Sequence, residues 1–243
     1  MLLVLRSDRF ASLFVHLVSA DHCEHIARVR RKVQRLGVGH LVFLDETYKR
    51  EGDVDNYSIF LPGQPHIIET SVTARYAARY DMIAACTGKE VLLPAVYAPS
   101  ERRAGITTAV LLRFIDNLLA QQLRALDRYP LLLLLDRASI HSEQQIMEAL
   151  QNRGCGEVTE IIKLPAASAK RLSPLDNALF NVWKQRVLDG PPLTRRNIKQ
   201  RMSDAWNSFT PAELRAQFRH CGLLRGQDVY FDCPDPPAHK HRS

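Results

Sequence analysis

The chain has 243 residues, of which 46% are hydrophobic, 24% charged and 7% aromatic, which is typical of a single soluble unit with one sizeable core. Lys and Arg outnumber Asp and Glu by 33 to 26, and the formal charge of +7 favours polyanionic partners. Five cysteines without a CxxC pair argue against a disulfide framework or a zinc finger and indicate an intracellular, reducing compartment, and no apolar run approaches the roughly 18 residues of a membrane helix.

The hydrophobic periodicity predicts an opening helix, then antiparallel strands, then alternating helices and strands closed by further helices. Such an order is typical of an α/β fold, a mixed five-stranded sheet with helices on both faces and a C-terminal helical extension. In chain order, the expected elements are a helix at 20–36, strands at 42–44, 78–87 and 90–97, a helix at 106–126, a strand at 129–136, a helix at 141–154, a strand at 160–165, and helices beginning at Ser173, Thr194 and Thr210.

Two of the apolar strands are expected to end on an acid, Asp45 and Asp136. A carboxylate at the end of a central strand is desolvated and rigidly held, so either a cation neutralises its charge or its pKa rises. If the two strands are neighbours, the carboxylates converge. A third carboxylate on a nearby helix would complete an oxygen-ligand site for Mg2+, and two such ions can promote in-line displacement at phosphorus.

Asp176 fits that third position, but it also fits a structural role. Ser173 is suited to be the N-cap of a helix and Pro174 its first residue, and Asp176 then completes a capping box and faces the positive end of the helix dipole. From the residues alone, both the capping and the chemical interpretation stay open.

Three ordered segments resemble the acidic motifs of mariner-superfamily transposases, and the resemblance extends from about residue 20 to about residue 222. The segments are FLDET at 43–47, LLDRASIH at 134–141 and LPAASAKRLSPLDNALFNVWK at 164–184. The resemblance implies a ribonuclease-H-like catalytic domain whose triad, Asp45, Asp136 and Asp176, binds two Mg2+ ions, with Mn2+ as a possible substitute. It also implies cutting of DNA at transposon ends and joining of the freed 3′-hydroxyl to target DNA.

The chain departs from the family pattern at several positions. Arg137 stands where Asn is usual, which would either weaken binding of the second metal ion or supply a phosphate contact. Asp176 replaces the usual Glu, and 39 residues separate it from Asp136, a spacing that aspartate versions of the family share. Only 44 residues precede Asp45, where family members carry two helix-turn-helix modules, so sequence-specific end recognition is expected to be absent from this chain.

Other polar residues have both a functional and a structural interpretation. Glu46 is expected on the opposite face of its strand from Asp45, as a supporting residue rather than a metal ligand. His141 is expected to form hydrogen bonds at a strand-to-helix turn. The basic stretch at 27–35 is either a DNA-binding arm or a solvated helix face, and the same alternatives apply to the candidate phosphate contacts Lys184, Arg186, Arg195, Arg196 and Lys199.

We therefore expect a nuclear DDE/DDD transposase catalytic domain that acts on DNA, as a homo-oligomer and without a membrane segment. The alternatives are an inactive or host-adopted relic that only binds DNA, and a lone nuclease that cuts without joining. The expected organisation is an N-terminal helical segment at 1–40, truncated relative to the family, a catalytic domain at 41–190, C-terminal helices packed on it at 191–232, and a disordered tail at 233–243.

Overall fold

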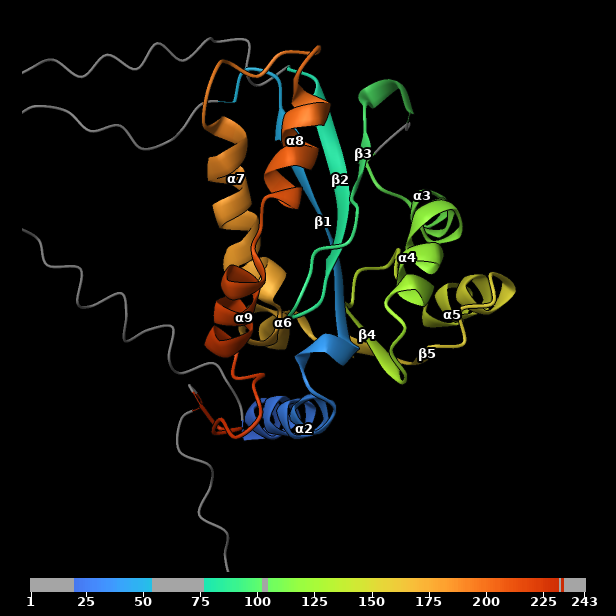
Figure 1. The fold of residues 1–243 in the computed structure, drawn as a ribbon, viewed down its shortest axis with the longest axis vertical. Helices are drawn as coiled ribbons and strands as arrows, with labels where there is room; N and C mark the ends of the chain where they lie inside the picture. The colour runs from blue at the N-terminus through green and yellow to red at the C-terminus, as the bar shows by residue number, and fades with distance from the viewer. Residues whose placement is uncertain (1–19, 54–76, 102–104, 232, 234–243) are drawn as a thin grey trace, which may run out of the picture.

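A five-stranded sheet forms the centre of the computed structural model, which describes residues 20–53, 77–101, 105–231 and 233 (Figure 1). The strands are β1 (Leu41–Arg50), β2 (Arg79–Cys86), β3 (Ala95–Tyr97), β4 (Leu131–Asp136) and β5 (Val158–Leu164). Their order is β3-β2-β1-β4-β5. β1 runs antiparallel to β2 and parallel to β4, β2 and β3 are antiparallel, and β4 and β5 are parallel. The mixed sheet expected from the sequence is confirmed.

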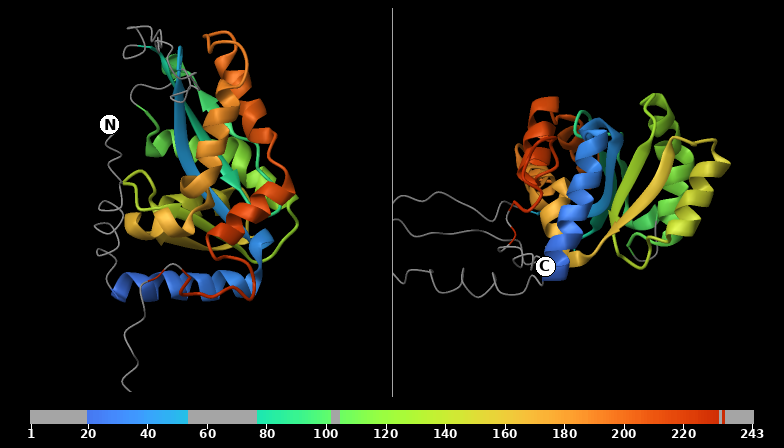
Figure 2. Two further views of the ribbon diagram at one scale, coloured as in Figure 1. Left: turned by 90° about the vertical axis from the view of Figure 1, so that its left-hand side faces the viewer. Right: turned by 90° about the horizontal axis from the view of Figure 1, so that it is seen from below.

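Helices cover both faces of this sheet (Figures 1 and 2). The first layer consists of α2 (Ala20–Leu36), α6 (Ala166–Leu172), the π-helical turn η6 (Leu175–Leu179), α7 (Phe180–Leu188), α8 (Ile198–Asn207) and α9 (Pro211–His220). The second consists of α3 (Thr108–Phe114), the π-helical turn η5 (Ile115–Leu119), α4 (Ala120–Ala125) and α5 (Glu143–Asn152). Two short 3-10 turns, η2 (Val38–His40) and η4 (Pro99–Glu101), precede β1 and follow β3.

The alternation of side chains along the strands produces two separate cores. On β1, Leu41 and Phe43 pack with the first helical layer, while Val42 and Leu44 pack with the second, and all four are at most 1% exposed. The adjacent strand β4 is buried on both faces in the same way, which explains its unbroken run of leucines. Asp45 and Asp136 therefore lie on strands that the two cores hold rigidly.

The prediction that the first strand ends at Asp45 was wrong. β1 continues to Arg50, and residues 46–50 pair with residues 79–83 of β2 even though β4 has already ended. The antiparallel neighbour supplies hydrogen-bond partners that the sequence pattern of β1 alone does not reveal. Asp45 consequently lies within its strand, at the level where the parallel neighbour stops.

Two other expectations about elements need correction. The strand expected at 90–97 is reduced to β3, with only an isolated bridge between Cys86 and Val91 before it, because Pro94 lacks the N–H needed to continue the ladder. The segment before Ser173 forms the helix α6, which the sequence pattern does not predict. The expected helix at 106–126 is confirmed as α3, η5 and α4 in succession.

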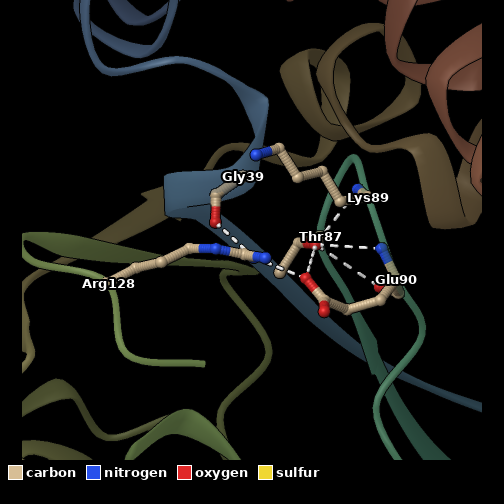
Figure 3. A network of polar contacts seen from close by, with 5 residues as sticks. All are labelled: Gly39, Thr87, Lys89, Glu90 and Arg128. Atoms are coloured by element: carbon tan, nitrogen blue, oxygen red, sulfur yellow. Dashed lines mark hydrogen bonds and ion pairs between the residues drawn. The ribbon is translucent and has the colours of Figure 1, made fainter. Parts of the chain in front are cut away.

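A polar network connects the end of β2 to the turn before β1 (Figure 3). The buried hydroxyl of Thr87 accepts hydrogen bonds from the backbone N–H groups of Lys89 (3.1 Å) and Glu90 (3.2 Å). Arg128 forms an ion pair with Glu90 and donates to the Gly39 carbonyl at 3.1 Å. A Cβ at Gly39 would lie only 3.1 Å from Cε of Lys89. The network thereby holds the start of β1 against the end of its antiparallel partner.

The helix α2 is part of the same core as the C-terminal helices. Arg30 is fully buried and donates hydrogen bonds to the carbonyl oxygens of Cys221 (3.0 Å), Val229 (3.2 Å) and Phe231 (2.6 Å). The approach is close enough that a Cβ at Gly222, where φ is +71°, would lie 2.8 Å from Nε of Arg30. Part of the basic stretch at 27–35 is therefore engaged inside the protein.

Some expectations fall outside the described residues, among them the start of the N-terminal segment at 1–19 and the tail at 234–243. Across the ranges that the structure describes, every helix is too short or too polar to cross a lipid bilayer.

Candidate active site

Asp45, Asp136 and Asp176 line one small cavity. The parallel register pairs Phe43 with Leu134, so Asp45 on β1 and Asp136 at the end of β4 reach the same level of the sheet. Both lie on the face that α6 and η6 cover, and Asp176 enters from the first turn of η6. The structure thus brings together the three acids singled out in the sequence, which lie far apart along the chain.

Both interpretations of Asp176 have a counterpart in the structure. Its backbone N–H donates to the Ser173 hydroxyl at 3.3 Å, as in a cap, but the Ser173 N–H donates to the Ala169 carbonyl at 2.8 Å, so the reciprocal half of the expected capping box does not form. The Asp176 carboxyl group, however, contacts the Asp45 carboxyl group and the Ser173 hydroxyl. The helix start therefore serves to direct an acid into the cavity.

The surroundings of Asp45 and Asp176 do not neutralise the negative charge that these two side chains would carry. Burial, and next the neighbouring carboxylate of Asp176, raise the pKa of Asp45 to about 8. Burial also raises the pKa of Asp176, against the opposing effect of its hydrogen bond with Asp45. Two carboxylates in contact cannot both be ionised at low cost, so either a proton or a bound cation must reside between them.

Asp136 lies in a different electrostatic environment. His141 Nδ1 lies 2.7 Å from its Oδ1, and this hydrogen bond lowers the pKa of Asp136. Nε2 of the same imidazole lies 3.0 Å from Oε1 of Glu46. Although burial lowers it, the hydrogen bonds to Asp136 and Glu46 raise the pKa of His141 to about 10. Asp136 is therefore held as a carboxylate beside an imidazolium.

The donor atoms of the cavity fit a divalent cation of the Mg2+ type. The polar side chains that line it, those of the three aspartates and Ser173, offer only oxygen atoms, the ligands that Mg2+ and Mn2+ prefer. In the described part of the chain no three His, Cys, Asp or Glu side chains form a preassembled metal cluster. Asp45 and Asp176 instead contact each other, and an ion between them would neutralise their excess charge.

Two lysines near the site were not predicted from the sequence. Nζ of Lys163, on β5, donates to the His141 carbonyl at 2.6 Å, and the charge of Lys170, on α6, acts on the Asp176 carboxyl group. Lys170 falls within the third acidic motif, which is the only signal that could have indicated it. Arg137 is exposed and lies near α2, where its charge helps to lower the pKa of His25, after the larger effects of burial and Arg28.

The cations proposed as phosphate contacts fall into two groups. Arg186 forms an ion pair with Glu213, and its guanidinium lies 4.4 Å from the ring centre of Phe209. Nζ of Lys199 lies 2.6 Å from a carboxylate oxygen of Glu101. The side chains of the other group extend partly or fully into solvent; they are Lys184, Arg195 and Arg196.

The strand order and the carboxylates on β1, β4 and η6 define a ribonuclease-H-like α/β domain. Residues 40–198 match the family described as DDE superfamily endonuclease. The chain belongs to this family, as the sequence motifs predicted.

Solved structures of the Mos1 mariner transposase have the same fold. The paired-end complex with the left transposon end superposes with a TM-score of 0.63 at 17% identity, covering 83% of this chain and 57% of the Mos1 chain. For the strand transfer complex the values are 0.58, 18%, 89% and 61%, and for the isolated catalytic domain 0.55, 13%, 84% and 87%. The chain thus spans little more than half of the Mos1 chains bound to DNA. No curated protein sequence matches it significantly.

Proposed function

We propose that this chain is the catalytic domain of a mariner-type transposase, which cuts DNA phosphodiester bonds and joins the freed 3′-hydroxyl to target DNA. The observation that carries the proposal is the convergence of Asp45, Asp136 and Asp176 on one cavity in a member of the DDE endonuclease family. The structures of the similar Mos1 transposase, which include a strand transfer complex and paired-end complexes with Mn and Mg, support it.

In this proposal the three aspartates hold two Mg2+ ions, with Mn2+ able to substitute. Bound there, such ions supply the positive charge that activates an attacking water or 3′-hydroxyl and stabilises the leaving oxygen. The residues of the chain supply the positioning: strand β1 fixes Asp45, His141 keeps Asp136 ionised, and the cap at Ser173 directs Asp176. Lys170, whose charge acts on the Asp176 carboxyl group, and the exposed Arg137, which follows Asp136 in the chain, are the proposed contacts to phosphates of the DNA.

DNA is the proposed partner, and the proposed compartment is the nucleus. The formal charge of +7 and the exposed Arg195 and Arg196 support DNA binding. Lack of a disulfide among the described cysteines is compatible with a reducing compartment. We also propose a homo-oligomer on DNA, as the paired-end complexes of the similar Mos1 transposase suggest.

The test is nicking of supercoiled plasmid, and joining of a pre-cut 3′-hydroxyl end, by the purified protein in Mg2+ and in Mn2+. Asp136→Ala is expected to lose activity by about 100-fold or more, because it removes a metal-binding carboxylate. Asp116→Ala is the matched control, since Asp116 is an acid on the second helical layer that pairs with Arg153 at 3.2 Å. It is expected to keep wild-type activity.

The same assay separates the alternatives. If the wild type and Asp136→Ala are equally inactive in both metals while both bind DNA, the chain is a relic that binds DNA. If the wild type nicks plasmid but never joins ends, it is a nuclease that acts alone.

A further inference from the structure

His141 lies between two carboxylates that belong to opposite faces of the sheet. Successive residues of β1 point to opposite sides, so Asp45 faces the acidic cavity and Glu46 faces the second helical layer. His141, in the connection between β4 and α5, reaches both sides. Its Nδ1 is 2.7 Å from Oδ1 of Asp136 and its Nε2 is 3.0 Å from Oε1 of Glu46. The imidazole therefore connects Glu46 to the cavity.

The position of His141 is itself well defined. Its side chain is fully buried, its backbone N–H donates to the Ala138 carbonyl at 3.0 Å, and its carbonyl accepts the bond from Lys163. Both ring nitrogens have a carboxylate acceptor, so the ring orientation that satisfies both hydrogen bonds is unique. Such a side chain can hold a neighbour in place.

The hydrogen bonds to the Asp136 carboxylate converge on one of its two oxygens. Oδ1 lies 2.7 Å from Nδ1 of His141 and accepts from the Ala138 N–H at 2.8 Å. In the described part of the chain no other hydrogen bond to this carboxylate is found, so Oδ2 is the oxygen left for a cation. Partners of this kind fix the orientation of a metal-binding carboxylate and are often as necessary for affinity as the ligands.

We propose that Glu46 and His141 are positioning residues for the metal site: His141 holds Oδ1 of Asp136 and leaves Oδ2 for the ion, and Glu46 holds His141 from the opposite face of the sheet. The inference rests on the metal-binding role of Asp136 proposed above. It extends the site to the side chain of Glu46, which does not line the cavity.

The first test measures binding of Mn2+ alone to the full chain, without DNA, by the loss of the free-ion electron paramagnetic resonance signal. His141→Leu, which has no hydrogen-bond donor, is expected to weaken Mn2+ binding by about tenfold or more. His141→Asn carries an amide N–H close to the position of Nδ1 but cannot reach Glu46, so it is expected to bind Mn2+ more tightly than His141→Leu and about as tightly as Glu46→Ala.

The second test uses Glu46, which is partly exposed, so that its replacement leaves the core intact. Glu46→Ala removes the acceptor of Nε2 and is expected to weaken Mn2+ binding by about threefold to tenfold. Glu46→Gln keeps an acceptor oxygen and is expected to bind more tightly than Glu46→Ala. Far-UV circular dichroism and thermal unfolding establish that each variant is folded, and if His141→Leu does not fold, the Glu46 pair decides.

Asp136→Asn separates failure of this inference from failure of the proposed function. If Asp136→Asn loses Mn2+ binding while folded His141→Leu and Glu46→Ala bind as the wild type does, the positioning role is overturned and the metal site stands. Equal weakening in His141→Leu and His141→Asn would also overturn it, because then packing, and not the hydrogen bond, matters. If Asp136→Asn itself binds Mn2+ normally, the metal site is wrong.

Discussion

Asp45 lies in an environment that is unfavourable to its own charge. In the unfolded chain its carboxyl group ionises with an ordinary pKa near 3.8, whereas in the fold burial and Asp176 raise that pKa to about 8. The folded state therefore binds the proton more tightly. The resulting contribution to stability is fully present below about pH 4, and it is lost as the pH rises toward 8.

We predict that Asp45→Asn stabilises the metal-free protein in a pH-dependent manner. At pH 8 in EDTA, the free energy of unfolding is expected to rise by about 1–3 kcal/mol, because the variant has no charge to bury. At pH 4 the difference from the wild type should be much smaller. Urea unfolding at the two pH values measures it, with Asp116→Asn as a control that should change little at either. An equal effect at both pH values would contradict the electrostatic cause.

At the same scale, the sequence located the three aspartates but not their supporting contacts. The acids follow short apolar runs or helix-start residues in recognisable motifs, and these signals are local. Glu46 was expected on the opposite face of its strand from Asp45, as a supporting residue, but only the path of the connection that carries His141 brings Glu46 and Asp136 within reach of one ring. Lys163 contacts this connection because β5 lies beside β4, which a single-chain pattern does not specify.

At the scale of elements, the basic side chains around α7 and α8 have distinct roles. Arg195 and Arg196 are exposed before α8. We predict that Arg195→Gln combined with Arg196→Gln weakens DNA binding. The slope of the logarithm of the binding constant against the logarithm of salt concentration should become less steep by about 2, because each phosphate contact releases about one counterion. Fluorescence anisotropy of a short DNA duplex, at roughly 50 to 300 mM salt, measures this slope.

Arg186→Gln is the contrasting change on α7. Its guanidinium is engaged with Glu213 and the Phe209 ring, so the variant is expected to lose about 1 kcal/mol of stability and to keep the salt dependence of DNA binding. A reduced slope in Arg186→Gln, or an unchanged slope in the double variant, would contradict the assignment of Arg195 and Arg196, rather than Arg186, as phosphate contacts.

The start of α9 provides a prediction about stability alone. Thr210 accepts from the Glu213 N–H at 3.3 Å, and the Glu213 carboxylate accepts from the Thr210 N–H at 2.8 Å, so the two residues form a reciprocal capping box. Thr210→Ala is expected to lower the free energy of unfolding by about 1 kcal/mol, whereas Thr210→Ser keeps the hydroxyl and most of the stability. Chemical denaturation compares the two, and identical midpoints would argue against the cap.

Elements that begin at a recognisable capping residue could be predicted from the sequence. Elements whose bounds depend on a neighbouring strand or helix could not. α5 and α9 begin at capping residues that can be recognised in the sequence. The extension of β1 to Arg50 depends on β2, whose residues pair with it across the sheet. α6 lies against α2, and its short segment has no cap of its own to indicate where it begins.

At the scale of the whole molecule, the hydrogen bonds of Arg30 join α2 to residues 221–231. Arg30→Met keeps the apolar stem but leaves the carbonyl groups of Cys221, Val229 and Phe231 without this donor. We predict a loss of about 3 kcal/mol in the free energy of unfolding, measured with urea. Arg28→Met is the control, since Arg28 is exposed on the same helix. Equal stability of the two variants would mean that α2 is not integral to the fold.

The order of the three acids along the chain has a consequence for biosynthesis. Asp45 leaves the ribosome early, but β4, which places Asp136 beside it, and η6, which carries Asp176, follow only after many more residues have been made. β4 and η6 are among the contacts of β1 that are most distant in sequence, and such contacts form late in folding. A nascent chain therefore carries isolated acids rather than a site. The proposed cutting activity would therefore arise only after η6, which follows the last strand of the sheet, has been synthesised and has folded.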